Sequence, residues 1–188
     1  MAGHRFNPEK AGRLLDPKRQ QIVPSEKVIE ILGVEKDDVI ADLGAGNGYF
    51  TVPIAKITEV PVYAIDIEPK MLDFLQEHAQ REGVTDIQYI TSDITQVPLD
   101  SGAVDKALIA FVAHEVPSLD DLFAEMRRMI NPGGKLLILE WEAVQSEMGP
   151  PLHERIPSQK LKELLEQKGF AVELFTISEP VYGLLVSM

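Results

Sequence analysis

The stretch from Val39 to Phe50 constrains the fold of this chain more than any other part of the sequence. It is a short apolar run that holds one acid, followed by three alternating glycines and the start of an amphipathic pattern. This order is typical of a buried parallel strand that turns tightly into a helix. Because glycine has no Cβ, the backbone of such a turn can adopt unusual conformations and approach a bound group closely. The stretch therefore predicts a small-ligand site at the turn.

Beyond this turn the sequence alternates strand-like and helix-like segments. Further strands are predicted over 60–67, 86–91, 104–112 and 135–141. Helices with one apolar face are predicted to begin at Pro24-Ser25, Pro69 and Ser118, and Ser158 is predicted to cap a last helix. The third of these helices is expected to include Ile130 and to be broken by Asn131–Gly134. Strands separated by helices form right-handed crossovers, which predicts a mostly parallel sheet with both faces covered.

The C-terminal end departs from this alternation. Two β-rich runs, 170–177 and 181–186, are separated by only a few residues, too few for a helix. They are therefore expected to pair as an antiparallel hairpin, with the last strand reversed relative to the others. The length of 188 residues suits one domain, which we place at 25–188.

Residues 1–24 are predicted to form a basic arm on an otherwise acidic protein. The arm holds five lysines and arginines against two acids, whereas the whole chain has a net charge of −12. It could fold over the active site as a lid, or meet an anionic substrate. Alternatively, it is a solvated terminal segment, because basic runs are common at chain ends.

Composition excludes several classes of function. A net charge of −12 disfavours nucleic acid as a partner, since that binding depends on neutralising phosphates. The chain has no cysteine, so it can form no disulfide and no thiolate metal site. No apolar run approaches the roughly 20 residues that span a bilayer, and the first residues contain no apolar signal-peptide core. We therefore expect a cytoplasmic protein that is not inserted in a membrane; a homodimer is left open.

Three acids fall at or near the ends of the first three strands: Asp42, Asp66 and Asp93. Ligands of open parallel sheets bind outside the carboxyl ends of the strands, so these acids should surround the glycine turn. Adjacent carboxylates would repel a phosphate. They suit a ligand with an ammonium or sulfonium charge, a ribose diol and an adenine amine. Asp66 would accept from the ribose hydroxyls, Asp93 from the adenine amine, and Asp42 would balance an α-amino group.

With these acids the chain resembles the class I S-adenosylmethionine-dependent methyltransferases. Five features carry the resemblance: the first motif at 42–48, the ribose-binding acid within 64–68, the adenine-side motif at 92–94, the turn at 131–136 and the closing hairpin. The resemblance implies an α/β, doubly wound, seven-stranded sheet of order 3-2-1-4-5-7-6 with an antiparallel last strand. It also implies S-adenosylmethionine as cofactor, S-adenosylhomocysteine as product, a small-molecule methyl acceptor and no metal.

The resemblance further implies which residues bind the cofactor. They are Asp42, Gly44, Ala45, Gly46, Asn47, Gly48, Asp66, Ile67, Met71, Asp93, Ile94 and Phe111. Pro53 delays regular helical hydrogen bonding until near Phe50, which leaves earlier amides free for the carboxylate of the ligand.

Other interpretations of the glycine turn stay open at this point. The glycines could serve only a tight turn, and the acids could be ordinary loop or cap residues. A nicotinamide-dinucleotide oxidoreductase is disfavoured, because Tyr49 occupies the position where G-x-G-x-x-G would place its last glycine. A catalytically silent cofactor-binding or scaffold protein of the same fold is the alternative of a different class.

The methyl acceptor is less well marked in the sequence than the donor. His114 and Glu115 follow the fourth strand, where this family usually places substrate-facing residues. His114 could be a general base oriented by Glu115, because imidazole readily removes a proton near neutral pH. The alternative is a histidine at the start of a helix, packed against the cofactor. The acceptor atom, O, N, S or C, is not predicted.

Overall fold

A seven-stranded sheet holds the site residues in place, and the computed structural model describes it within residues 17–188. The strands are β1 (Ile40–Leu43), β2 (Val62–Asp66), β3 (Ile87–Thr91), β4 (Val104–Ala110), β5 (Ile130–Trp141), β6 (Ala171–Ser178) and β7 (Val181–Ser187). The helices are α1 (Pro17–Ile22), α2 (Ser25–Leu32), α3 (Thr51–Ala55), α4 (Pro69–Arg81), α5 (Leu119–Met129) and α6 (Ser158–Gln167). The part of the predicted arm that precedes Pro17 lies outside the described residues.

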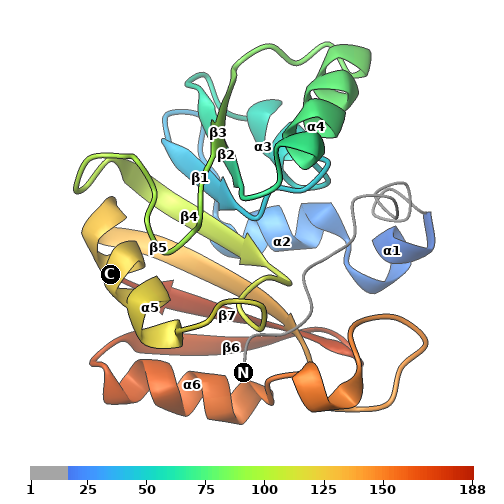
Figure 1. The fold of residues 1–188 in the computed structure, drawn as a ribbon, viewed down its shortest axis with the longest axis vertical. Helices are drawn as coiled ribbons and strands as arrows, with labels where there is room; N and C mark the ends of the chain where they lie inside the picture. Colours follow the sequence, from blue (N-terminus) through green and yellow to red (C-terminus); the bar gives the residue numbers. More distant parts are fainter. Residues whose placement is uncertain (1–16) are drawn as a thin grey trace.

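The strand order is β3-β2-β1-β4-β5-β7-β6 (Figure 1). Strands β1 to β5 are parallel, whereas β7 pairs antiparallel with both β5 and β6. The predicted fold class, including the reversed last strand, is therefore confirmed. Because β1 and β4 are neighbours at the point where the strand order reverses, a crevice is expected outside their carboxyl ends.

Helices cover both faces of the sheet (Figure 1). Alternate residues of β5 point to opposite sides: Leu137 and Leu139 pack with α2, α3 and α4, and Leu136 and Ile138 pack with α5 and α6. All four of these side chains are buried. Burial on both faces explains why the strands read as continuous apolar runs in the sequence.

Helix ends follow the expected chemistry with one exception. Gly33 ends α2 in the left-handed conformation, with φ 68°, and Ser118 caps α5 by accepting from the backbone N–H of Asp121. The prediction that Ser158 caps the last helix is wrong, because Ser158 is already helical and Pro157 precedes it without a side-chain cap. Proline at this position presets an extended φ and still lets its carbonyl accept the first helical bond, from Leu161.

The predicted break before the fifth strand is a bulge inside β5. Helix α5 ends at Met129, and Ile130, which was predicted to be helical, already pairs with Val104. The next paired residue of β5 is Lys135, opposite Lys106. Gly134 sits so close to the carbonyl oxygen of Asp105, on the neighbouring strand, that a Cβ would overlap it. The bulge therefore depends on a contact between strands that local sequence does not reveal.

No helix within residues 17–188 is long and apolar enough to cross a membrane.

Candidate functional site

The glycine turn between β1 and α3 adopts the left-handed conformation at each of its three glycines. The φ angles are 77° at Gly44, 56° at Gly46 and 85° at Gly48, a region that residues with a Cβ rarely enter. A Cβ at Gly44 would overlap the side chain of Val112, and one at Gly48 would lie 2.8 Å from Cγ of Leu75. The turn therefore packs against the segment that follows β4 and against α4, as well as reversing the chain, and regular helix begins only at Thr51.

Asp66, the last residue of β2, holds the glycine turn in place. Its Oδ2 accepts from the backbone N–H of Gly46 at 2.9 Å, and its Oδ1 accepts from that of Glu68 at 2.9 Å. Burial raises the pKa of this carboxyl group, although both hydrogen bonds act in the opposite direction. An ionised carboxylate offers about four acceptor positions, so each oxygen can still accept from a ribose hydroxyl.

Asp42 is a buried acid in the middle of β1. It is 1% exposed, and its Oδ2 accepts from Oγ1 of Thr51 at 2.6 Å. Burial, with a smaller contribution from the charge of Asp66, raises the pKa of Asp42 to about 7, whereas the Thr51 bond and the charge of Arg19 lower it. At neutral pH this carboxyl group is only partly ionised, so a nearby cation would favour its ionised form.

The raised pKa of Asp42 predicts how stability depends on pH. An acid whose pKa is raised by folding stabilises the protein fully below its unfolded pKa, about 3.9, and loses this contribution as the pH rises through about 7. We expect Asp42→Asn to remove this decline from the unfolding free energy of the ligand-free protein. Denaturant titrations at about pH 5 and about pH 8 measure the unfolding free energy of both proteins. The same decline with pH in the variant as in wild type would contradict the raised pKa of Asp42.

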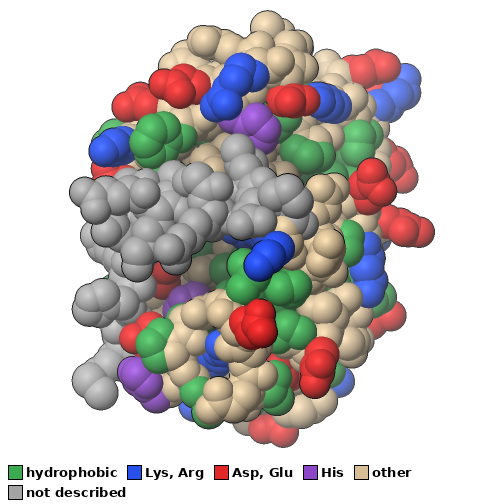
Figure 2. Space-filling view, turned by 90° about the vertical axis from the view of Figure 1, so that its right-hand side faces the viewer, with side chains coloured by type: hydrophobic (Ala, Val, Ile, Leu, Met, Phe, Trp, Pro, Cys, Tyr) green, Lys and Arg blue, Asp and Glu red, His purple; other side chains and the backbone are tan. Residues whose placement is uncertain are grey.

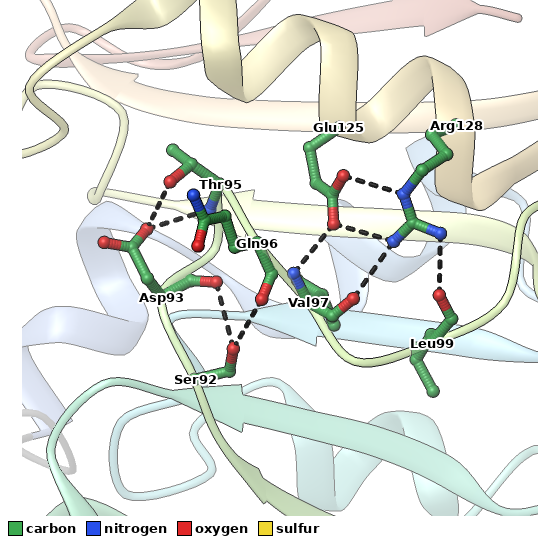
Figure 3. Close-up of polar contacts among 8 residues, drawn as sticks. All are labelled: Ser92, Asp93, Thr95, Gln96, Val97, Leu99, Glu125 and Arg128. Atoms are coloured by element: carbon green, nitrogen blue, oxygen red, sulfur yellow. Dashed lines mark hydrogen bonds and ion pairs between the residues drawn. The ribbon is translucent and has the colours of Figure 1, made fainter.

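Asp93 lies in the loop after β3, on the same edge of the sheet. Its Oδ1 accepts from the backbone N–H of Thr95 at 2.9 Å and from the Thr95 hydroxyl at 2.7 Å. In Figure 3 the other carboxylate oxygen points away from Thr95. The hydroxyl of Ser92 donates to the carbonyl of Gln96 and narrows the same loop. One carboxylate oxygen of Asp93 thus holds the loop through Thr95, and the other points away from these bonds.

An ion pair on α5 fixes the far half of this loop (Figure 3). Glu125 accepts from the backbone N–H of Val97 at 2.7 Å, and Arg128 donates to the carbonyls of Val97 and Leu99 at 3.0 and 2.6 Å. The two side chains also bind each other through two hydrogen bonds of 2.7 and 2.8 Å. Charge-assisted pairs of this geometry are stronger than neutral hydrogen bonds, so the loop is held against the helix.

We expect Arg128→Met to loosen the loop that carries Asp93. The free energy of unfolding should fall by about 1–2 kcal/mol, and the affinity for adenosine should fall with it. Arg127→Met is the matched control, because Arg127 stacks on Phe170 and donates to the carbonyl of Lys168 instead. Titration calorimetry with adenosine compares the two; equal affinities would show that the loop does not reach the adenine.

The remaining predicted cofactor residues lie on the same edge but differ in exposure. Ile67, next to Asp66, is 41% exposed, which is unusual for a large apolar side chain beside a strand end. Met71 and Ile94 are buried at 4% and 5%, as are Ala45 and Asn47 within the turn. The structure thus leaves only Ile67 of these apolar side chains open to a planar ring.

His114 is paired with an acid that the sequence interpretation missed. Its Nδ1 lies 2.9 Å and 3.0 Å from the two carboxylate oxygens of Glu140, and its backbone N–H donates to Glu140 as well. Glu115, the expected orienting residue, is 3.9 Å from Nε2. The orienting position at Nδ1 therefore belongs to Glu140. A lone acid in the apolar run 136–141 was the available signal.

The pair sets the protonation of His114. Burial lowers the pKa of His114, but the hydrogen bond and charge of Glu140, with Glu115 and Glu154, outweigh burial, so the pKa is raised. Glu140 is fully buried and also accepts from the backbone N–H of Trp141 at 3.3 Å. The imidazole therefore keeps its proton to a higher pH than a free histidine does.

An aromatic wall borders the other side of the turn. Phe111, directly after β4, has φ 64° and packs on Trp141 with ring centroids 5.2 Å apart. A positive φ at a bulky residue is strained and is kept where the surroundings impose it. Tyr49, directly after Gly48, donates its hydroxyl to the carbonyl of Val23 at 2.7 Å. From α1, the guanidinium of Arg19 lies between the rings of Tyr49 and Phe111.

These groups fit an adenosyl ligand that carries a positive charge. The three left-handed glycines form a tight turn after β1, Asp66 and Asp93 keep acceptor oxygens at or just after the ends of neighbouring strands, and Asp42 is a buried acid on β1. Of the predicted residues, the turn and Asp66 share a hydrogen bond, Asp42 accepts from Thr51 at the start of α3, and Asp93 and His114 are placed by separate networks. Fold and site together define a Rossmann-like protein of the S-adenosylmethionine-binding class.

Comparison with known proteins agrees with this class. Residues 41–138, just over half of the chain, match the family model described as "Methyltransferase domain". The ubiquinone/menaquinone biosynthesis C-methyltransferase UbiE of Teredinibacter turnerae is 31% identical over 123 residues, 64% of this chain and 49% of that protein. The demethylmenaquinone methyltransferase of Tropheryma whipplei is 28% identical over 153 residues, 79% of this chain and 62% of that protein. The chain thus spans about half to three-fifths of these relatives.

Solved structures show the same relationship. A SAM-dependent methyltransferase from Aquifex aeolicus superposes with a TM-score of 0.90 at 26% identity, covering 97% of this chain and 99% of that one. The [4+2]-cyclase SpnF, at 19% identity and a TM-score of 0.73 over 84% of this chain and 60% of that one, shares the fold alone. The chain belongs to the class I S-adenosylmethionine-dependent methyltransferases, and S-adenosylmethionine is the cofactor of that family. The dinucleotide alternative is thereby set aside.

Proposed function

We propose that this protein transfers a methyl group from S-adenosylmethionine to a nucleophilic atom of a small molecule in the cytoplasm. The observation that carries the proposal is Asp66, which binds the amide of Gly46 and keeps acceptor capacity at the strand end where a ribose would lie. We infer that residues 25–188 act as one domain and that 1–24 is a lid. Homodimerisation is not part of the proposal.

The binding roles follow from the positions of the acids. Asp66 would hold the ribose diol, Asp93 the adenine amine, and Asp42 the α-amino group. Ile67 would pack against the adenine ring, since it is the exposed apolar side chain beside Asp66. These contacts would orient the donor and exclude water from it. The expectation that amides of the glycine turn stay free for the carboxylate of the ligand is wrong for Gly44, Ala45 and Gly46, because the first two donate to the carbonyl of Ile65 and the third donates to Asp66.

The donor, once bound, supplies a methyl group that its positive sulfur has already activated for attack. The residues of the chain then mainly need to align the nucleophile and keep water out, effects worth roughly 7–11 kcal/mol at best. His114, held at Nδ1 by Glu140, is our candidate for removing the proton of the acceptor through Nε2. Because its pKa is raised, the free base that accepts a proton becomes available as the pH rises.

The names of the relatives support a quinol as the acceptor. One is a C-methyltransferase of ubiquinone and menaquinone biosynthesis and the other a demethylmenaquinone methyltransferase. In a hydroquinone, loss of a hydroxyl proton makes the neighbouring ring carbon nucleophilic, which is the step that a base assists. Phe111 is partly exposed and packs on the buried Trp141, so it would give a planar acceptor an apolar neighbour.

A nucleic-acid acceptor is disfavoured by charge. On the face shown in Figure 2, the coloured basic side chains, which belong to the described residues, are scattered among acidic ones. The net charge of −12 acts in the same direction.

Release of S-adenosylhomocysteine tests the function. Wild-type protein is incubated with S-adenosylmethionine and 1,4-naphthohydroquinone, or with an aliphatic amine or thiol. We expect turnover with the quinol that increases with pH and is lost in Asp66→Ala. Donor binding without turnover on any acceptor would favour the catalytically silent alternative. Turnover only with the amine or thiol would exclude the quinol.

A further inference from the structure

Helix α1 places a cation near the carboxyl ends of β1 and β4. The Cζ of Arg19 lies 4.8 Å from the ring centroid of Tyr49 and 5.3 Å from that of Phe111. Tyr49 follows the glycine turn and Phe111 follows β4, so the guanidinium lies at the point where the strand order reverses. This is where ligands of such sheets bind. Arg19 is therefore placed close to where a ligand of the turn is expected to bind.

The guanidinium is held by ring faces and lacks a hydrogen-bonded acceptor among residues 17–188. Arginine has five N–H donors, and ring faces satisfy its charge but not these donors. Burial lowers the pKa of Arg19 to about 10, and the charges of Tyr49 and Asp42 offset this only in part. A partly buried cation whose donors find no acceptor within residues 17–188 is costly in free energy, and an anionic ligand would lower that cost.

The acid next to Arg19 indicates which anion fits. Asp42 is buried and feels the charge of Arg19, although the two side chains come from different elements, β1 and α1. A carboxylate and a guanidinium on either side of one glycine turn complement the ammonium and carboxylate of an α-amino acid. The methionine end of S-adenosylmethionine is such a group. A planar guanidinium also suits a carboxylate better than an ammonium does, because it can donate two parallel hydrogen bonds.

We propose that Arg19 binds the methionine carboxylate of the methyl donor while Asp42 binds its ammonium group. This inference rests on the proposed function, because it takes S-adenosylmethionine as the ligand. It assigns a donor-binding residue to α1, which lies outside the matched region 41–138. Tyr49 and Phe111 then act by fixing the guanidinium between their rings, and the bond from Tyr49 to Val23 holds the end of α1 on the turn.

Ligands that lack parts of the methionine end test the proposal directly. Titration calorimetry is done with S-adenosylmethionine, decarboxylated S-adenosylmethionine and 5′-methylthioadenosine, using wild type, Arg19→Met and Arg19→Lys. Arg81→Met is the control, because it removes the same charge from an exposed position at the end of α4. Circular dichroism, with the affinity for 5′-methylthioadenosine, reports whether each variant is folded.

We expect Arg19→Met to weaken S-adenosylmethionine binding about 10- to 100-fold. Binding of the decarboxylated donor and of 5′-methylthioadenosine should change little. Arg19→Lys should give an intermediate loss, and Arg81→Met none. An equal loss for the donor with and without its carboxylate, an unchanged affinity for both, or tighter binding would overturn the proposal. Failure of the proposed function is distinguishable, since wild type would then not bind the donor, or Asp66→Ala would bind it equally well.

Discussion

Replacing Glu140 with glutamine should lower the free energy of unfolding by about 3–5 kcal/mol near pH 6. Glu140 is fully buried at the end of β5 and faces the imidazole of His114 at 2.9 Å. Without the carboxylate, the buried imidazolium of His114 has no counter-charge, and the buried N–H of Trp141 loses its charged acceptor. Denaturant titration at several pH values measures the loss.

The pH dependence of this loss identifies its cause. A histidine whose pKa is raised by folding stabilises the protein fully below its unfolded pKa, about 6.5, and the contribution disappears as the pH rises through the folded value. The difference between wild type and Glu140→Gln should therefore shrink toward about pH 9. Glu173→Gln, an exposed change on β6, should stay within about 0.5 kcal/mol of wild type. A difference that is the same at both ends of the range would show that His114 carries no charge in the pair.

Gly44→Ala should cost about 2–4 kcal/mol of stability and abolish donor binding, because two effects act on it together. Alanine at this position would have to adopt a φ of 77°, and its Cβ would also overlap the side chain of Val112. To relieve the overlap, the turn must move away from Val112, and this displaces the surface on which we propose that the donor binds. Thermal unfolding and donor titration measure the two losses.

Gly83→Ala separates these effects. Gly83 has a φ of 70°, close to that of Gly44, but a Cβ there would meet nothing within 4 Å. This variant should lose only the conformational part, about 1 kcal/mol, and bind the donor like wild type. If the two alanine variants lost the same stability, the packing of the turn against Val112 would play no role.

Much of the fold follows from local sequence because the buried parallel strands are apolar runs separated by helical patterns. The closing hairpin was predictable for a similar reason, since the connection between β6 and β7 leaves no room for a helix. The start of β5 was not predictable, because Gly134 is required by the carbonyl of Asp105 on another strand. The cap at Ser158 was wrongly predicted because Pro157 occupies the N-cap position and Ser158 is already the first helical residue.

The site was predictable where a residue and its role share one strand end. Asp42 lies one residue before the end of β1, Asp66 ends β2 and Asp93 follows β3 by two residues, so topology brings them to one edge. Glu140 was missed because its partner is 26 residues away. Arg19 could not be singled out from the other basic residues of the arm, because its position between two rings depends on how α1 docks.

The central claim is that the glycine turn and Asp66 form the binding site of S-adenosylmethionine. Calorimetric titration of the donor into wild type, Asp66→Ala and Asp66→Asn tests it most directly, with Asp73→Ala, an exposed acid of α4, as the charge-matched control. We predict that wild type and Asp73→Ala bind alike and that Asp66→Ala binds at least about 100-fold more weakly, as expected for two lost bonds to a charged acceptor. No binding by wild type, or equal binding by folded Asp66→Ala and Asp66→Asn, would contradict the claim.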